Sequence, residues 1–75
     1  MPEPMPLATH VAFAGLLLCV TLADGRTISA PLEWFPRLRD ATEAQRKNWR
    51  LIGGGVGIHW EDLDEDVSVA GLLAA

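Results

Sequence analysis

The apolar residues of the chain gather in short runs that are separated by turn-forming residues, a pattern typical of strands. The run Val11–Leu22 is rich in Val, Leu, Phe and Thr and is soon followed by Asp24-Gly25. Asp-Gly between two strand-like runs predicts a two-residue hairpin turn in which both residues have positive φ. We therefore expect strands over Val11–Leu22 and Arg26–Ala30, the second stopped by Pro31, which has no N–H to donate to a sheet.

A helix and a second pair of strands are expected further along. Thr42 and Gln45 have the spacing of a capping box, which predicts a helix that continues through Lys47. Trp49–Ile52 and Val56–Trp60 then have the composition of two strands. The three consecutive glycines between them permit a tight or bulged reversal of the chain at low steric cost.

The order of these elements predicts the fold class. The β-β-α-β-β order indicates an α+β domain: a small antiparallel sheet of two hairpins, with one helix on one face and a short C-terminal helical turn within Ser68–Leu73. Prolines at positions 2, 4 and 6 predict a flexible N-terminal arm over residues 1–7. The remaining residues, 8–75, are enough for a single domain.

The first predicted strand is apolar on both faces, which predicts association. Leu16, Leu18, Val20 and Leu22 share one face, and Phe13, Leu17 and Cys19 share the other. A single helix covers only one face of a small sheet, so the second face needs another cover. We therefore expect Leu16, Leu18 and Val20 to contact a second copy of the chain or another protein.

Composition and charge exclude several classes of protein. Apolar residues make up 49% of the 75 residues, which excludes a disordered chain. Six basic and ten acidic residues give a net charge of −4, the wrong sign for a general nucleic-acid binder. The lone Cys19 excludes an intramolecular disulfide and favours a cytoplasmic location. The longest apolar run is shorter than the roughly 20 residues of a membrane-spanning helix, so no membrane association is expected.

Half of the acidic residues lie within residues 61–66. Asp62, Asp64 and Asp66 match the first three ligand positions of an EF-hand loop. Val67, however, stands where the sharp turn of that loop needs glycine, and Leu73 stands where it needs a bidentate glutamate. We therefore expect no metal site, and interpret the three aspartates as a docking surface for a basic partner or as a solvated turn.

All six basic residues lie between Arg26 and Arg50. A phosphate-binding patch is one interpretation, but the net charge opposes it, and acidic residues are interspersed. Pairing with the acidic segment, within a chain or between subunits, is the interpretation that we favour. Such pairs set the register of an interface more than its strength.

His59 is the strongest candidate for chemistry because histidine titrates near neutral pH. No Gly-x-Ser-x-Gly elbow and no second histidine at metal-binding spacing accompanies it. We expect a structural histidine whose ring bonds a carboxylate or a backbone carbonyl beside Trp60. An acid–base pair with Asp64 or Asp66 is the alternative, and neither a catalytic residue nor a cofactor is expected.

The three tryptophans divide between core and interface. Trp49 and Trp60 fall on facing predicted strands and are expected in the core. Trp34 and Phe35 lie in the loop Pro31–Pro36, where flanking prolines lower the entropy cost of presenting aromatic side chains. Trp34 and Phe35 are therefore the best aromatic candidates for a partner interface, although core packing is the first interpretation even for them. We count Trp34, Phe35, His59 and the three aspartates among the candidate partner-binding residues.

Several of these segments resemble a known family. They are Leu-Ala-Asp-Gly-Arg-Thr-Ile-Ser at 22–29, Pro-Leu-Glu-Trp-Phe-Pro-Arg-Leu at 31–38, Gly-Ile-His-Trp at 57–60 and Leu-Asp-Glu-Asp at 63–66. Together they resemble the bacterial family named domain of unknown function 2442, over roughly residues 10–73. The resemblance implies a small α+β fold and no established catalytic activity. Some longer relatives carry a helix-turn-helix module, and short ones often occur in two-gene pairs that resemble toxin–antitoxin systems, which implies a partner.

The sequence therefore predicts a non-enzymatic protein–protein interaction module, an antitoxin-like or regulatory partner of a small protein encoded by a neighbouring gene. The expected partners are a second copy of the chain or that neighbour, with no membrane and no nucleic acid bound by the chain alone. A nucleic-acid-associated transcriptional regulator is the first alternative. A small hydrolase that uses His59 and the acidic segment is the second.

Overall fold

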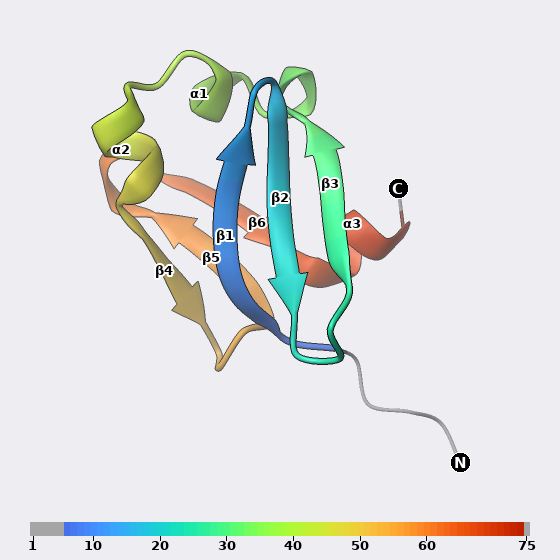
Figure 1. Ribbon diagram of the computed structural model, residues 1–75. Coiled ribbons are helices and arrows are strands. Elements are labelled where there is room, and N and C mark those ends of the chain that lie inside the picture. Colours follow the sequence, from blue (N-terminus) through green and yellow to red (C-terminus); the bar gives the residue numbers. More distant parts are fainter. Residues whose placement is uncertain (1–5, 75) are drawn as a thin grey trace.

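The computed structural model describes residues 6–74 and shows two small antiparallel sheets joined by short helices (Figure 1). The first sheet has the order β1-β2-β3, and its strands are β1 (Ala8–Ala14), β2 (Leu17–Leu22) and β3 (Thr27–Pro31). The second has the order β4-β5-β6, with β4 (Trp49–Ile52), β5 (Gly57–Trp60) and β6 (Glu65–Ser68). The predicted α+β class is confirmed.

Short helices connect and follow the sheets. Between β3 and β4 come a 3-10 turn, η1 (Leu32–Trp34), and the helices α1 (Pro36–Arg39) and α2 (Glu43–Lys47). A second 3-10 turn, η2 (Glu61–Leu63), separates β5 from β6, and α3 (Val69–Ala74) ends the described chain. None of these helices has the length and apolar character needed to cross a membrane, within the residues that the structure describes.

The single strand expected over Val11–Leu22 is wrong, because this segment contains a hairpin. The chain reverses at Gly15 and Leu16, where Gly15 takes a φ of 58°. Phe13 consequently faces Leu18 across the pair β1–β2. Apolar residues continue on both sides of the turn, so the sequence pattern gives no break at this point.

The hairpin expected at Asp24-Gly25 is present with a longer loop. The Leu22 N–H donates to the Arg26 oxygen over 2.8 Å, which leaves residues 23–25 as the connection. Gly25 has a φ of 92°, whereas Asp24 has negative φ. The expectation of positive φ at both turn residues is therefore wrong, since a three-residue loop needs only one such residue.

The helix expected after Thr42 is confirmed together with its capping box. The Thr42 hydroxyl accepts from the Gln45 N–H over 3.1 Å, and the Gln45 side chain accepts from the Thr42 N–H over 2.9 Å. The C-terminal helical turn is confirmed as α3. The acidic segment contributes an unexpected strand, β6, which pairs with β5 after Asp64 turns the chain with a φ of 49°.

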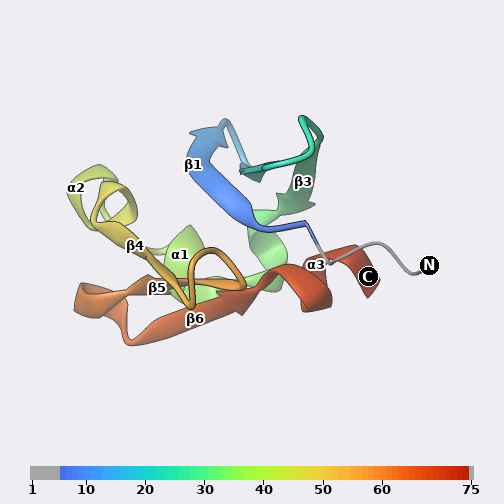
Figure 2. The same ribbon diagram turned by 90° about the horizontal axis from the view of Figure 1, so that it is seen from below.

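The core lies between the two sheets, which pack face to face (Figure 2). Leu18 and Val20 are completely buried, and Ile58 and Trp60 of β5 belong to the same apolar cluster. The expectation that Leu18 and Val20 lie on an uncovered face is therefore wrong. Residues 6–74 form six strands instead of the four expected, and the second sheet covers the face that the sequence left open. Leu16 remains 74% exposed because it lies in the β1–β2 turn.

A hydrogen-bond chain fixes the helices to the core. The indole N–H of buried Trp60 donates to the backbone oxygen of Arg46 over 2.9 Å. The Arg46 guanidinium in turn donates to the backbone oxygens of Leu38, over 2.8 Å, and Arg39, over 2.6 Å. The same Trp60 ring meets Phe13 of β1 edge to face, with 6.4 Å between ring centroids. Trp60 therefore connects both sheets with α1 and α2.

The turn between β4 and β5 holds the start of β1. Gly55 has a φ of 120°, and its carbonyl accepts from the Ala8 N–H over 2.8 Å. A Cβ atom at Gly55 would lie 2.5 Å from the Ala8 oxygen, closer than real Cβ contacts allow. The neighbouring Gly54, with a φ of 73°, has open space around that position.

We therefore expect Gly55→Ala to destabilise the fold more than Gly54→Ala. Gly54→Ala puts alanine in the left-handed region, at a cost of about 1–2 kcal/mol. Gly55→Ala adds a clash with backbone and weakens the Ala8 hydrogen bond, for a total of about 2–4 kcal/mol. Urea denaturation of both variants measures the difference, and equal losses would show that the approach of β1 to this turn is unimportant.

Candidate functional site

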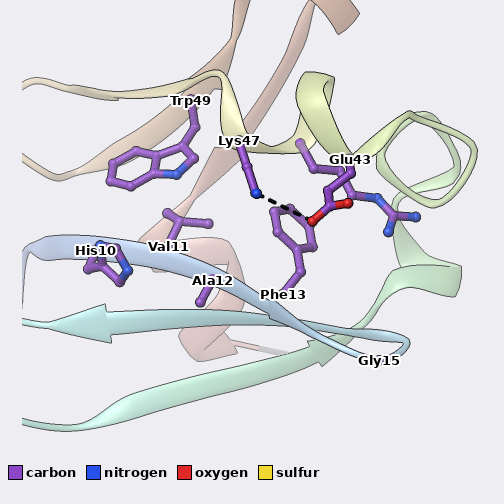
Figure 3. Close-up of a pocket in the computed structure, with 9 residues that line it drawn as sticks. His10, Val11, Ala12, Phe13, Gly15, Glu43, Lys47 and Trp49 are labelled. Atoms are coloured by element: carbon purple, nitrogen blue, oxygen red, sulfur yellow. Dashed lines mark ion pairs between the residues drawn. The ribbon is translucent and has the colours of Figure 1, made fainter.

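A groove with a volume of about 570 Å³ lies between β1 and the segment α2–β4 (Figure 3). The nine residues that line it come from β1 and its turn, from α2 and from the start of β4: His10, Val11, Ala12, Phe13, Gly15, Glu43, Arg46, Lys47 and Trp49. It combines aromatic side chains with a few convergent charged groups, the usual composition of a binding site.

Aromatic rings form the apolar part of the groove. Phe13 and Trp49 point into it from opposite walls (Figure 3). His10 meets Trp49 edge to face, with 5.6 Å between ring centroids, and this contact closes one end of the groove. The Arg46 guanidinium lies 5.6 Å from the centroid of the Phe13 ring, a cation–π contact that fixes the other wall.

Charged groups of α2 border the same groove. Lys47 Nζ lies 3.3 Å from Glu43 Oε1, one helical turn earlier, but their side chains are 74% and 84% exposed. Such an exposed pair contributes little and is easily exchanged for another partner. With Arg46 included, the groove carries two cations and one carboxylate on a chain whose net charge is −4. The groove is therefore locally positive.

The groove runs beside the outer edge of β1. Within the described sheets β1 pairs only with β2, so its other edge faces the groove. The Leu22 N–H donates to the Arg26 oxygen, and the Leu32 N–H donates to the Leu16 oxygen. These backbone hydrogen bonds show that the even-numbered residues of β2 point their N–H and C=O groups toward β3. Phe13, which faces Leu18, therefore points its own N–H and C=O away from β2.

The residues expected to bind a partner do not line this groove. Leu18 and Val20 are in the core, and Leu16 lies at the exposed turn. Trp34 and Phe35 line a different pocket of about 260 Å³, together with Asp66, Val67, Ser68, Gly71 and Leu72 of β6 and α3. Trp34 is 55% exposed and Phe35 is half-buried. This pocket brings together three of the predicted partner-binding residues, Trp34, Phe35 and Asp66.

One sequence pattern belongs to this groove, although its residues were assigned to charge pairing and to the core. Arg46 and Lys47 lie just before Trp49, a short basic and aromatic combination. We expected Trp49 in the core, but it is half-buried, and its ring forms a wall of the groove. The groove could not be predicted because the sequence pattern does not show the β1–β2 turn. Without that turn, β1 is not a separate strand with a free edge.

His59 binds acidic side chains through both ring nitrogens. Nδ1 is hydrogen-bonded to an Asp66 carboxylate oxygen, and Nε2 lies 3.5 Å from Glu61 Oε1. The Asp66 hydrogen bond, with smaller effects of the Asp66 and Glu61 charges, raises the pKa of His59 above its ordinary value. The expected bond between the His59 ring and a carboxylate is present, and the carboxylate is that of Asp66.

The basic middle of the chain and the acidic segment do pair within one chain. Arg50 Nη2 donates to Glu61 Oε1 over 2.7 Å, a hydrogen bond that lowers the pKa of Glu61. Arg37 donates to the Asp64 backbone oxygen over 2.7 Å, and Asn48 donates to an Asp62 carboxylate oxygen over 3.1 Å. Within residues 6–74 no three His, Cys, Asp or Glu side chains are grouped so that they could hold a metal ion.

Comparisons with known proteins show a matching family and similar solved structures. The family described as protein of unknown function DUF2442 matches residues 9–75. The crystal structure of a protein of unknown function from Rhodospirillum rubrum is similar at 32% identity and a TM-score of 0.80, over 95% of this chain and 88% of that one. The solution structure of an uncharacterized protein from Chromobacterium violaceum is similar at 26% identity and a TM-score of 0.77. That match covers 91% of this chain, which spans only 64% of the Chromobacterium protein. A comparison with curated proteins gives no match.

We expect the His59–Asp66 pair to stabilise the fold in a pH-dependent way. Because the folded-state pKa of His59 is raised above 6.5, the stabilisation is complete below about pH 6.5 and is lost as the pH rises through the raised value. Asp66→Asn should therefore lower the thermal midpoint by a few degrees in mildly acidic buffer, with a smaller difference in alkaline buffer.

Asp64→Asn is the matched control, since it removes a nearby carboxylate that does not contact His59 and retains a side chain compatible with positive φ. Its unfolding midpoint should follow that of the unmodified chain across the same pH range. A constant effect of Asp66→Asn at all pH values would contradict the role of the charged ring.

Proposed function

Since the chain belongs to the DUF2442 family of proteins of unknown function, we propose a function from its geometry: it is a non-enzymatic protein–protein interaction module that binds its partner in the groove beside β1. The observation that carries the proposal is the position of this groove. It joins the outer edge of a strand, two aromatic walls and a locally positive rim in one place. Strand edges are ready-made templates for another chain.

The surroundings of the two described histidines support a role other than catalysis. Nδ1 of His59 is hydrogen-bonded to Asp66 and Nε2 lies 3.5 Å from Glu61 Oε1, and among the described residues no serine, threonine or cysteine side chain is hydrogen-bonded to this ring. His10 lines the groove, and the eight other residues that line it include no serine, threonine or cysteine.

The partner that we propose is the product of a neighbouring gene, for which this chain acts as an antitoxin-like or regulatory subunit. Its resemblance to short family members in two-gene pairs supports this choice. Within the acidic segment the Glu61 carboxylate is paired with Arg50 and the Asp66 carboxylate with His59, so part of its charge is already engaged inside the chain. The groove beside β1 therefore replaces the acidic segment as the proposed docking surface.

Reversal of one charge tests this function. Lys47→Glu changes the rim of the groove at an exposed position and should leave folding intact. Arg26→Glu makes the same change in charge at the β2–β3 loop, away from the groove (Figure 1). We expect the co-expressed neighbour product to co-purify with the unmodified chain and with Arg26→Glu, and to bind Lys47→Glu about tenfold or more weakly, equivalent to 1.4 kcal/mol.

Two results would contradict the proposal. One is a partner that binds both variants equally, which would place the interface elsewhere on the molecule. The other is an unmodified chain that sediments as a monomer at micromolar concentration, both alone and with the neighbour product. Circular dichroism of the variants shows whether a loss of binding reflects a loss of fold.

A further inference from the structure

We propose that the groove beside β1 takes an extended segment of the partner that alternates acidic and apolar residues and adds a fourth strand to the first sheet. This inference rests on the proposed function and names the chemistry of the segment that the groove would bind. Three features of the groove support it independently: the direction of the β1 backbone, the aromatic walls and the charge of α2.

The backbone of β1 offers hydrogen bonds to an incoming chain. The N–H and C=O of Phe13 point away from β2, toward the groove. Val11 has the same orientation two residues earlier but is only 3% exposed. The His10–Trp49 contact closes the groove at the Val11 end, so the added segment is short and pairs mainly with Phe13 (Figure 3). Addition of a strand to a free sheet edge is a recurring mode of peptide recognition.

The walls of the groove determine which side chains fit. In an added strand, alternate side chains point to the same side as Phe13. Those side chains would lie between the half-buried rings of Phe13 and Trp49, where an apolar group displaces water from aromatic surface. The intervening side chains stay at the rim of the groove, where charge is tolerated.

The charge of the rim favours carboxylates at those intervening positions. Lys47 is held only by an exposed pair with Glu43, so a carboxylate of the partner can take its place beside the ammonium group. The Arg46 guanidinium is already bonded to two backbone oxygens and contributes its charge without moving. On a chain with a net charge of −4, this local positive charge directs an acidic segment to the groove and away from the remaining surface.

The test uses synthetic heptapeptides with blocked ends. The first alternates glutamate and valine, the second replaces each glutamate by lysine, and the third keeps glutamate but carries N-methyl groups on every valine. The second peptide keeps the apolar side chains and reverses the charge. The third keeps charge and side chains but cannot donate its valine N–H groups to a strand. Titrations followed by NMR of the labelled full chain give the affinity and the position of each peptide.

We expect the glutamate–valine peptide to bind about tenfold or more tightly than either control, and to bind Lys47→Glu more weakly than Arg26→Glu by a similar factor. The Phe13 amide should exchange rapidly in the free chain and become protected when this peptide binds. The Ala12 amide, which points toward β2, is protected in both states and serves as the internal reference.

The remaining outcomes overturn the inference in distinguishable ways. Equal binding of the N-methylated peptide, or an unchanged Phe13 amide, would show that the groove recognises side chains without strand addition; the proposed function would stand. Equal binding of the lysine peptide would refute the acidic segment. If none of the peptides binds at millimolar concentration while the neighbour product still depends on Lys47, the groove accepts a folded surface instead. Concentration-dependent self-association that is lost in Lys47→Glu would identify a second copy of this chain as the occupant.

Discussion

The fold depends on the burial of one tryptophan that also needs a hydrogen-bond acceptor. Trp60 lies between the two sheets with no exposed surface, so its indole N–H has to be satisfied within the protein. The acceptor is the carbonyl of Arg46 near the end of α2, and the Arg46 side chain binds the carbonyls of α1. One buried donor thus determines where α2 lies. The position of α2 in turn forms one wall of the groove and leaves β1 as an edge strand, so the candidate site follows from the same contact that stabilises the core.

Local sequence patterns predicted local structure well. The capping box at Thr42 specified α2 because the two hydrogen bonds that define it lie within four residues. The strands on either side of the glycine triplet were expected at Trp49–Ile52 and Val56–Trp60, and are found as β4 and β5. The pattern failed at Gly15, where apolar residues continue through a turn, and at Glu65–Asp66, where acidic residues form a strand. β6 forms because Val67 in the strand and Val69 just after it reach the core, whereas the side chain of Asp66 points to His59.

The candidate site was harder to predict than the fold, and the reason is geometric. A carboxylate partner for the His59 ring was expected from the sequence, and the structure identifies it as Asp66, seven residues away. The groove joins residues 10–15, 43–47 and 49, and its existence depends on which edge of β1 remains unpaired. That edge is a property of topology, which the missed hairpin concealed. Trp34 and Phe35 were identified as interface candidates from their flanking prolines, and both line the pocket beside β6 and α3.

The arrangement of the two sheets also has a consequence for how the chain folds. Each sheet is a meander built from consecutive segments, residues 8–31 for the first and 49–68 for the second, so the pairings within a sheet join residues that are close in sequence. Short loops close quickly and at a small entropy cost, and each half can therefore form its turns independently. Neither half has a core of its own, because the buried side chains of both face the same layer between them. The cooperative step of folding is therefore the docking of the two meanders. During synthesis the first meander emerges before the second, so its apolar face stays exposed until β5 has been made.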